Sequence, residues 1–241
     1  MTILTSTNKR LLAIALMTAA LTACGDDDDD NGDDPVVMPP PAMTQTYQIT
    51  LVNLTANQPM SPATVVSHPD SIALWTTGEM ASETLEMMAE GGDGSGFAEL
   101  EQVLASTSAD GMLMPGDSQN IEFELTAEQV DQLSFTTMLV NTNDAFTGLN
   151  GFDFSALAVD EQQAFMLNAY DAGTEANSEV KGSIPGPADG GEGFNAERDD
   201  VDRVFLHSGV ISQADGLMDS VLMPSHRFDN PVLAVHITRT K

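Results

Sequence analysis

The sequence predicts a mostly β protein, an antiparallel β-sandwich with a small helical insertion. Short segments in which apolar and polar residues alternate recur along the chain, as expected for half-buried strands. Turns that contain glycine or aspartate separate these segments. One main stretch has helical periodicity, and the chain has no internal repeat. These patterns predict a single domain over residues 46–241, long enough to bury one core.

The first predicted strand covers residues 46–54. Its alternation places Tyr47, Ile49 and Leu51 on one face, so we expect these side chains in the core. Seven or eight short strands of this kind are typical of a sandwich. The other β-prone segments are 64–67, 71–75, 120–125, 133–140, 164–169, 201–207 and 232–238.

The helical insertion is predicted over residues 79–90. Met80, Leu85 and Met88 approximate an apolar stripe at helical spacing, and a glycine pair directly afterwards ends it. A second short helix is predicted over residues 97–105.

The start of the chain carries an export signal. Lys9 and Arg10 precede an apolar run at residues 11–21, and Leu-Thr-Ala comes directly before Cys24. A basic start, an apolar run of this length and small residues at its end indicate a secretory signal peptide over residues 1–23. The run is too short for a permanent membrane-spanning helix. Its end resembles the bacterial lipobox, which implies that Cys24 becomes lipidated.

Residues 24–45 are predicted to form a flexible acidic tether behind the lipidated cysteine. They include five consecutive aspartates and a stretch with several prolines. Like charges repel each other and proline disfavours regular structure, so the segment should be extended. Because Cys24 is the only cysteine, the domain is expected to depend on its core, or on a metal, rather than on disulfides.

The chain is strongly acidic. Its formal net charge is −29, and loss of Lys9 and Arg10 with the signal peptide lowers this by two to −31. Such a charge repels phosphate backbones, so the composition argues against a nucleic-acid partner. We expect contact with the membrane only through the lipid anchor. Divalent cations would relieve the repulsion within the folded domain.

Two loops carry carboxylates directly after predicted strands. Asp144 lies in residues 141–148, and Asp171 and Glu175 lie in residues 170–177, on either side of a glycine that permits a tight bend. Carboxylates from two loops of one rigid scaffold are suitable ligands for a hard cation, above all calcium.

The same two loops resemble the spondin N-terminal domain family, the module that opens F-spondin and mindin. The resemblance extends over residues 45–240 and is most specific in the Asn-Asp-Ala-Phe-Thr-Gly and Tyr-Asp-Ala-Gly-Thr segments. It implies a β-sandwich of extracellular or exported proteins. The weaker matching segments are 47–54, 59–62 with 65–68, 78–90 and 230–238.

The resemblance also implies the calcium ligands. Matched residue by residue, they are Asp144, Asp171 and Glu175. Glu175 stands where the family usually has aspartate, and Ala145 stands where the animal proteins have tryptophan. The chain lacks the cysteines of the animal proteins, so their disulfides do not transfer.

Other interpretations of the polar residues stay open at this point. The three acids would also serve as simple loop caps. A zinc site is disfavoured because the four histidines have no ligand spacing, and His207 and His236 lie on predicted strands as outward-facing residues. The chain has no Gly-x-Ser-x-Gly motif of a serine hydrolase.

We therefore expect a non-catalytic module that is exported and lipid-anchored to the bacterial cell envelope, on the periplasmic face or the cell surface. It would bind calcium and use the stiffened loops for adhesion or recognition. The expected partner is an extracellular or envelope protein or a glycan. The alternatives are an envelope hydrolase with paired carboxylates and a passive structural lipoprotein.

Overall fold

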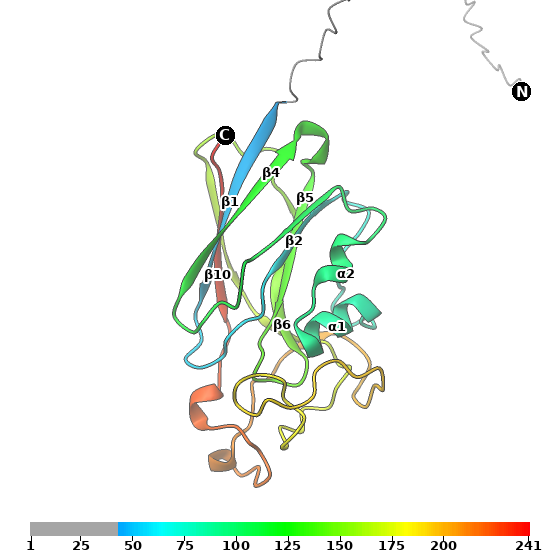
Figure 1. Ribbon diagram of the computed structural model, residues 1–241, viewed down its shortest axis with the longest axis vertical. Helices are drawn as coiled ribbons and strands as arrows, with labels where there is room; N and C mark the ends of the chain where they lie inside the picture. The colour runs from blue at the N-terminus through cyan, green and yellow to red at the C-terminus, as the bar shows by residue number, and fades with distance from the viewer. Residues whose placement is uncertain (1–42) are drawn as a thin grey trace, which may run out of the picture. The chain divides into compact units, whose positions relative to one another are not determined.

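The computed structural model describes residues 43–241, which form two antiparallel sheets packed face to face (Figure 1). This confirms the predicted β-sandwich. The predicted signal peptide over 1–23, the predicted lipidation site Cys24 and the predicted tether as far as residue 42 lie outside the described residues. Within residues 43–241, no helix has the length and apolar character needed to cross a bilayer.

The first sheet has four strands and contains both ends of the domain. Its β1 (Thr44–Asn53) lies between β4 and β10, so that Ile49 is paired with Ile121 on one side and Ile237 on the other. The alternation buries Tyr47, Ile49 and Leu51, as the sequence predicts. The strand order is β4 (Ser118–Thr126), β1, β10 (Leu233–Arg239) and β7 (Gln162–Leu167).

The second sheet has six strands and is covered on both faces. Its inner face contributes Phe135 to the core between the sheets, and its outer face contributes Val66 and Phe146 to a second apolar cluster under the helices. The strand order is β3 (Ala105–Ser108), β2 (Thr64–His68), β5 (Gln132–Met138), β6 (Ala145–Asp153), β8 (Ala169–Asp171) and β9 (Phe205–Leu206).

The helical insertion is α1 (Glu83–Gly91) followed by the one-turn α2 (Ser95–Ala98). The helix starts later than predicted because the Ser82 hydroxyl caps it by accepting a hydrogen bond from the Leu85 N–H. Gly92, with φ of 72°, ends it in the left-handed conformation. Three short 3₁₀ turns complete the elements: Ala127–Gln129, Gln213–Asp215 and Pro224–His226.

Two of the predicted elements are wrong. Residues 71–75 form no strand, because the Leu74 N–H and the Trp75 carbonyl bond the side chain of Asn150 instead of a neighbouring strand. The helix predicted over 97–105 ends at Ala98, and β3 starts at Ala105.

One further strand is shorter than the sequence indicates, and β6 was not predicted. Of the predicted strand at 201–207, only Phe205–Leu206 pair with a neighbouring strand, β8. The sequence analysis missed β6, whose glycines have low strand propensity. Gly148 is required there, because a Cβ at this position would lie 2.1 Å from the Phe135 carbonyl oxygen of β5.

The loops after β8 gather at one end of the sandwich, opposite the end where β1 begins and β10 finishes (Figure 1). Between the two sheets, Tyr47 and Phe154 pack edge to face with ring centroids 4.7 Å apart.

We predict that Phe135→Ala lowers the free energy of unfolding by about 3–5 kcal/mol, because it leaves a cavity between the sheets. Urea unfolding monitored by circular dichroism measures this loss. Met166→Ala on β7 is the control, since Met166 is 67% exposed and its loss should change stability by less than about 0.5 kcal/mol. Equal losses for the two variants would contradict the assignment of the core.

Candidate metal centre

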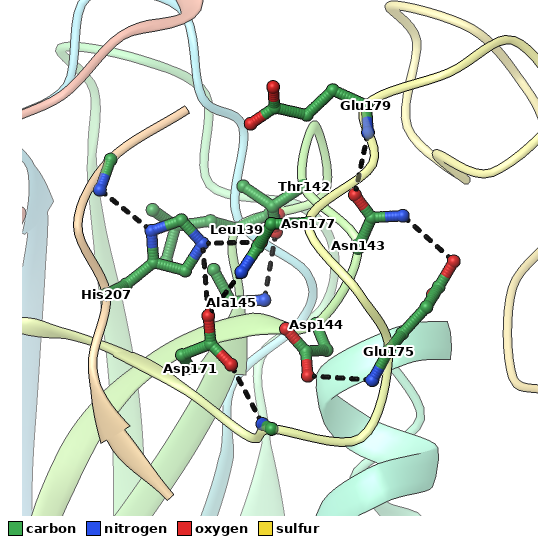
Figure 2. Close-up of polar contacts among 12 residues, drawn as sticks. Leu139, Thr142, Asn143, Asp144, Ala145, Asp171, Glu175, Asn177, Glu179 and His207 are labelled. Carbon is green, nitrogen blue, oxygen red and sulfur yellow. Dashed lines mark hydrogen bonds and ion pairs between the residues drawn. The ribbon is translucent and has the colours of Figure 1, made fainter. Parts of the chain in front are cut away.

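The pairing of β6 with β8 brings two of the predicted site residues together. Ala145, the first residue of β6, is the ladder partner of Asp171, the last residue of β8. Asp144 therefore lies beside Asp171 and Ala172, and its carbonyl oxygen accepts the Ala172 N–H at 3.3 Å. Figure 2 shows the carboxyl groups of Asp144 and Asp171 directed toward one another.

Asp144 is fully buried and has one free carboxyl oxygen. Its Oδ2 accepts hydrogen bonds from the backbone N–H groups of Thr174 (2.8 Å) and Glu175 (3.1 Å). Its Oδ1 is buried and has no hydrogen-bond partner among the described residues. A buried oxygen without a partner costs free energy, so this atom is available to a ligand.

Asp171 is also fully buried and is held by hydrogen bonds to both oxygens. Its Oδ1 accepts the Gly173 N–H at 2.8 Å, and its Oδ2 accepts the Asn177 side-chain N–H at 2.7 Å. The Nε2 atom of His207 lies 3.7 Å from Oδ2. Each carboxylate oxygen has two lone pairs, so Asp171 keeps acceptor capacity for a further ligand.

A nearby positive charge would stabilise the ionised forms of Asp144 and Asp171. Burial, and then the charge of Asp171, raises the pKa of Asp144 well above its usual range. Burial likewise raises the pKa of Asp171 to about 6, against the opposing hydrogen bonds from Asn177 and Gly173. Two neighbouring buried carboxyls do not both ionise readily. A nearby cation would therefore favour the ionised form of both carboxyls.

The structure does not bring the carboxylate of Glu175 to this pair. Its Oε1 accepts a hydrogen bond from the Asn143 side chain at 2.9 Å, and in Figure 2 its side chain runs away from Asp144 and Asp171. Burial raises the pKa of Glu175 to about 7. In residues 43–241, no three His, Cys, Asp or Glu side chains are arranged to hold one metal ion.

The donor set fits a hard cation in part. Asp144 and Asp171 supply two carboxylates with free lone pairs, and Oδ1 of Asp144 is the orphaned atom that a cation would satisfy. Calcium takes six to eight oxygens, so other ligands would have to complete the shell. Glu175 would contribute only after leaving Asn143.

A segment from residue 195 to residue 204, here called the strap, packs over the loop that follows Asp171. The Asp199 N–H donates to the Thr174 carbonyl at 3.1 Å, and the Asp202 N–H donates to the Gly173 carbonyl at 2.7 Å. Gly173 has φ of +70°, and a Cβ there would lie 2.2 Å from the Arg203 carbonyl oxygen. The site thus requires glycine at this position.

The strap is also fastened to α1. Arg198 donates to Glu86 of α1 at 2.5 Å and to Asp202 at 2.6 Å. The Asn195 N–H donates to Glu90 at 2.9 Å. The guanidinium of Arg198 is thereby engaged with acids other than Asp144 and Asp171.

Several residues of the site escaped the sequence analysis. His207 was expected to face outward, and this is wrong: its side chain is buried, with Nε2 3.7 Å from Oδ2 of Asp171. Asn143 and Asn177 lie within the two predicted ligand loops, residues 141–148 and 170–177, but were not assigned a role. A sequence signal did exist for them, since Asn143 directly precedes Asp144 and Asn177 follows Glu175 by two residues.

We predict that, in chelator, the melting temperature falls as pH rises from about 4 to 7, more steeply in the wild type than in Asp171→Asn. The folded-state pKa of Asp171 is raised to about 6, so its contribution is fully present below its unfolded value near 3.9 and is lost as pH rises through 6. The Asp144 carboxyl and the His207 imidazole lie beside this carboxyl, and the charge of Asp200 contributes to its raised pKa.

Asp153→Asn is the control for the pH series. Hydrogen bonds from Ser155 lower the pKa of the exposed Asp153, so its removal should change the pH slope in the opposite direction. Identical slopes for the wild type and Asp171→Asn would contradict the raised pKa of Asp171.

Comparison with known proteins identifies the family. Residues 53–183, which are more than half of the chain, match the family model described as Spondin_N. No curated protein matches the chain. The matched range contains Asp144, Asp171 and Glu175 but stops before the strap and His207. The chain belongs to the Spondin_N family.

Proposed function

We propose that this protein is a calcium-binding, non-catalytic module of the bacterial cell envelope, used for adhesion or recognition. The observation that carries the proposal is the buried pair of Asp144 and Asp171, with one carboxyl oxygen that no other group satisfies. A divalent cation is the simplest species that would allow both acids to ionise in this environment.

Asp144 and Asp171 would hold the ion, which supplies positive charge and oxygen coordination. Asp144 ends the loop before β6, and Asp171 ends β8, so a shared ligand would tie two strand ends together. Because Oδ2 of Asp144 already accepts two backbone N–H groups, residues 174 and 175 would become ordered with the ion. The site would therefore stiffen the loop end of the sandwich.

The loops around the site supply the surface for a partner. The end of the sandwich that carries them is well separated from the start of β1 (Figure 1). The strongly negative chain disfavours nucleic acid, so we propose an extracellular or envelope protein or a glycan as the ligand.

The position of the acids weighs against the hydrolase alternative. Asp144 and Asp171 are 0% exposed, and a glycosidase needs its two carboxyls on either side of a substrate. A neighbouring cavity of about 440 Å³ is lined by Trp75, Asn150 and Tyr170 but by neither acid. A passive structural role differs from our proposal in requiring no calcium.

The membrane anchor in this proposal is the acylated Cys24, preceded by the signal peptide of residues 1–23. This part of the proposal rests on the sequence pattern alone. It would place the domain on the periplasmic face or the cell surface.

We predict that calcium at 100 times its Kd stabilises the protein by about 2.7 kcal/mol. For a domain of this size each kcal/mol raises the melting temperature by about 2–4 °C. Differential scanning fluorimetry in calcium and in EDTA measures the shift. Asp171→Ala should abolish it, since the variant lacks one of the two paired carboxylates.

Asp215→Asn is the matched control for the calcium series. Asp215 accepts from Ser212 and Arg227 in a loop at the same end of the fold, so it is a capping acid without a role in the proposed site. The control should keep the full calcium shift. A wild type that melts at the same temperature in calcium and in chelator would disprove calcium binding.

We also predict that Cys24→Ala moves the protein from the detergent phase to the aqueous phase in Triton X-114 partitioning. Each buried CH₂ of an acyl chain contributes about 0.8 kcal/mol to membrane binding, and the variant has no thiol to acylate. Metabolic labelling with a fatty acid should mark the wild type alone. An unlabelled wild type in the aqueous phase would rule out the anchor.

A further inference from the structure

His207 is the buried polar residue of the site whose role the proposed function leaves open. It follows β9, is 5% exposed, and packs against Phe228 with ring centroids 5.4 Å apart. It lies beyond residues 53–183, so the family match does not include it. Figure 2 places its ring next to Asp171 and Asn177.

The hydrogen bonds of His207 assign its tautomer. The Gly209 N–H donates to Nδ1 at 2.9 Å, so Nδ1 is an acceptor and carries no proton. In a neutral imidazole the proton then resides on Nε2. The Nε2–H group faces the side-chain oxygen of Asn177 at 3.1 Å and donates to it.

Asn177 in turn orients the carboxylate of Asp171. With its oxygen bound to His207, the amide of Asn177 directs an N–H at Oδ2 of Asp171, 2.7 Å away. The chain of donors thus runs from Gly209 through His207 and Asn177 to one oxygen of Asp171. Outer groups of this type orient metal ligands, and their loss typically weakens metal binding by about 10–100-fold.

We propose that His207 is a positioning and specificity-determining residue of the cation site. Through Asn177 it fixes the carboxylate of Asp171 for the ion, and its Nε2–H group withholds a nitrogen lone pair from the site. This proposal rests on the proposed calcium function and deepens it. Its consequence is an oxygen-only site that suits calcium and gives zinc, copper and nickel no imidazole ligand.

The chain provides a matched control in His226. It is also 5% exposed, and its Nδ1 also accepts a backbone N–H, that of Met223, at 2.9 Å. It lines a cavity with Asn57 and Asn141 and does not face Asp144 and Asp171. A general effect of losing a buried histidine should therefore be the same for both positions.

The experiment is a calcium titration of the full chain in detergent by isothermal calorimetry, with the melting temperature in EDTA as a check on folding. We expect His207→Ala to weaken calcium binding by about 10–100-fold. His207→Gln, which retains a side-chain N–H at a similar distance from the backbone, should recover most of the affinity. His226→Ala should bind calcium as the wild type does.

A double variant separates positioning from a merely structural role. His207 and Asn177 act in series, so His207→Ala combined with Asn177→Ala should bind calcium about as weakly as either single variant. Additive losses would overturn the series arrangement. Equal calcium affinity for His207→Ala and the wild type would overturn the role of His207 while leaving the calcium site intact.

Zinc competition tests the specificity. In the wild type, zinc at the same concentration should not displace calcium. Displacement by zinc that His207→Ala abolishes would make His207 a ligand and overturn the proposal. A wild type that binds no calcium in the first titration would instead refute the proposed function itself, which keeps the two failures distinguishable.

Discussion

The antiparallel ladder between β6 and β8 is the constraint on which the site depends. It sets the start of one strand against the end of the other, so that Asp144 and Asp171 emerge side by side. Neither acid is free to turn to solvent, because the strap packs over the following loop and α1 holds the strap. The backbone pairing thus brings two buried carboxyl groups close together, which disfavours the ionisation of both.

The described part of the chain has few positively charged side chains that could neutralise Asp144 and Asp171. The whole sequence has 8 Lys and Arg against 37 Asp and Glu, and Arg198 is already bonded to Glu86 and Asp202. Instead, backbone N–H groups and the side chains of Thr174, Asn177 and His207 surround the pair, and they orient the carboxylates without neutralising them. This arrangement maintains two acids in a defined geometry at a cost in stability, as functional sites often do.

The sequence predicted the sandwich because most strands have a clear alternation, as in β1. It missed β6 because Gly148 and Gly151 hide the strand pattern, although the close approach of Phe135 is what requires Gly148. The meeting of Asp144 and Asp171 was predictable, since each comes from a loop at a strand end. The rotation of Glu175 toward Asn143 was not, because a side-chain torsion leaves no trace in residue spacing. The inward turn of His207 depends on contacts with Phe228 and Asn177, which are distant in sequence.

The path of β1 also determines at which end of the sandwich the chain enters the domain. The strand begins at Thr44 on the end opposite the acidic pair and has 10 residues, which at about 3.3 Å per residue gives a length of about 33 Å. The chain therefore enters the sandwich at the end opposite Asp144 and Asp171, and about one strand length separates that entry point from the loops around the two acids.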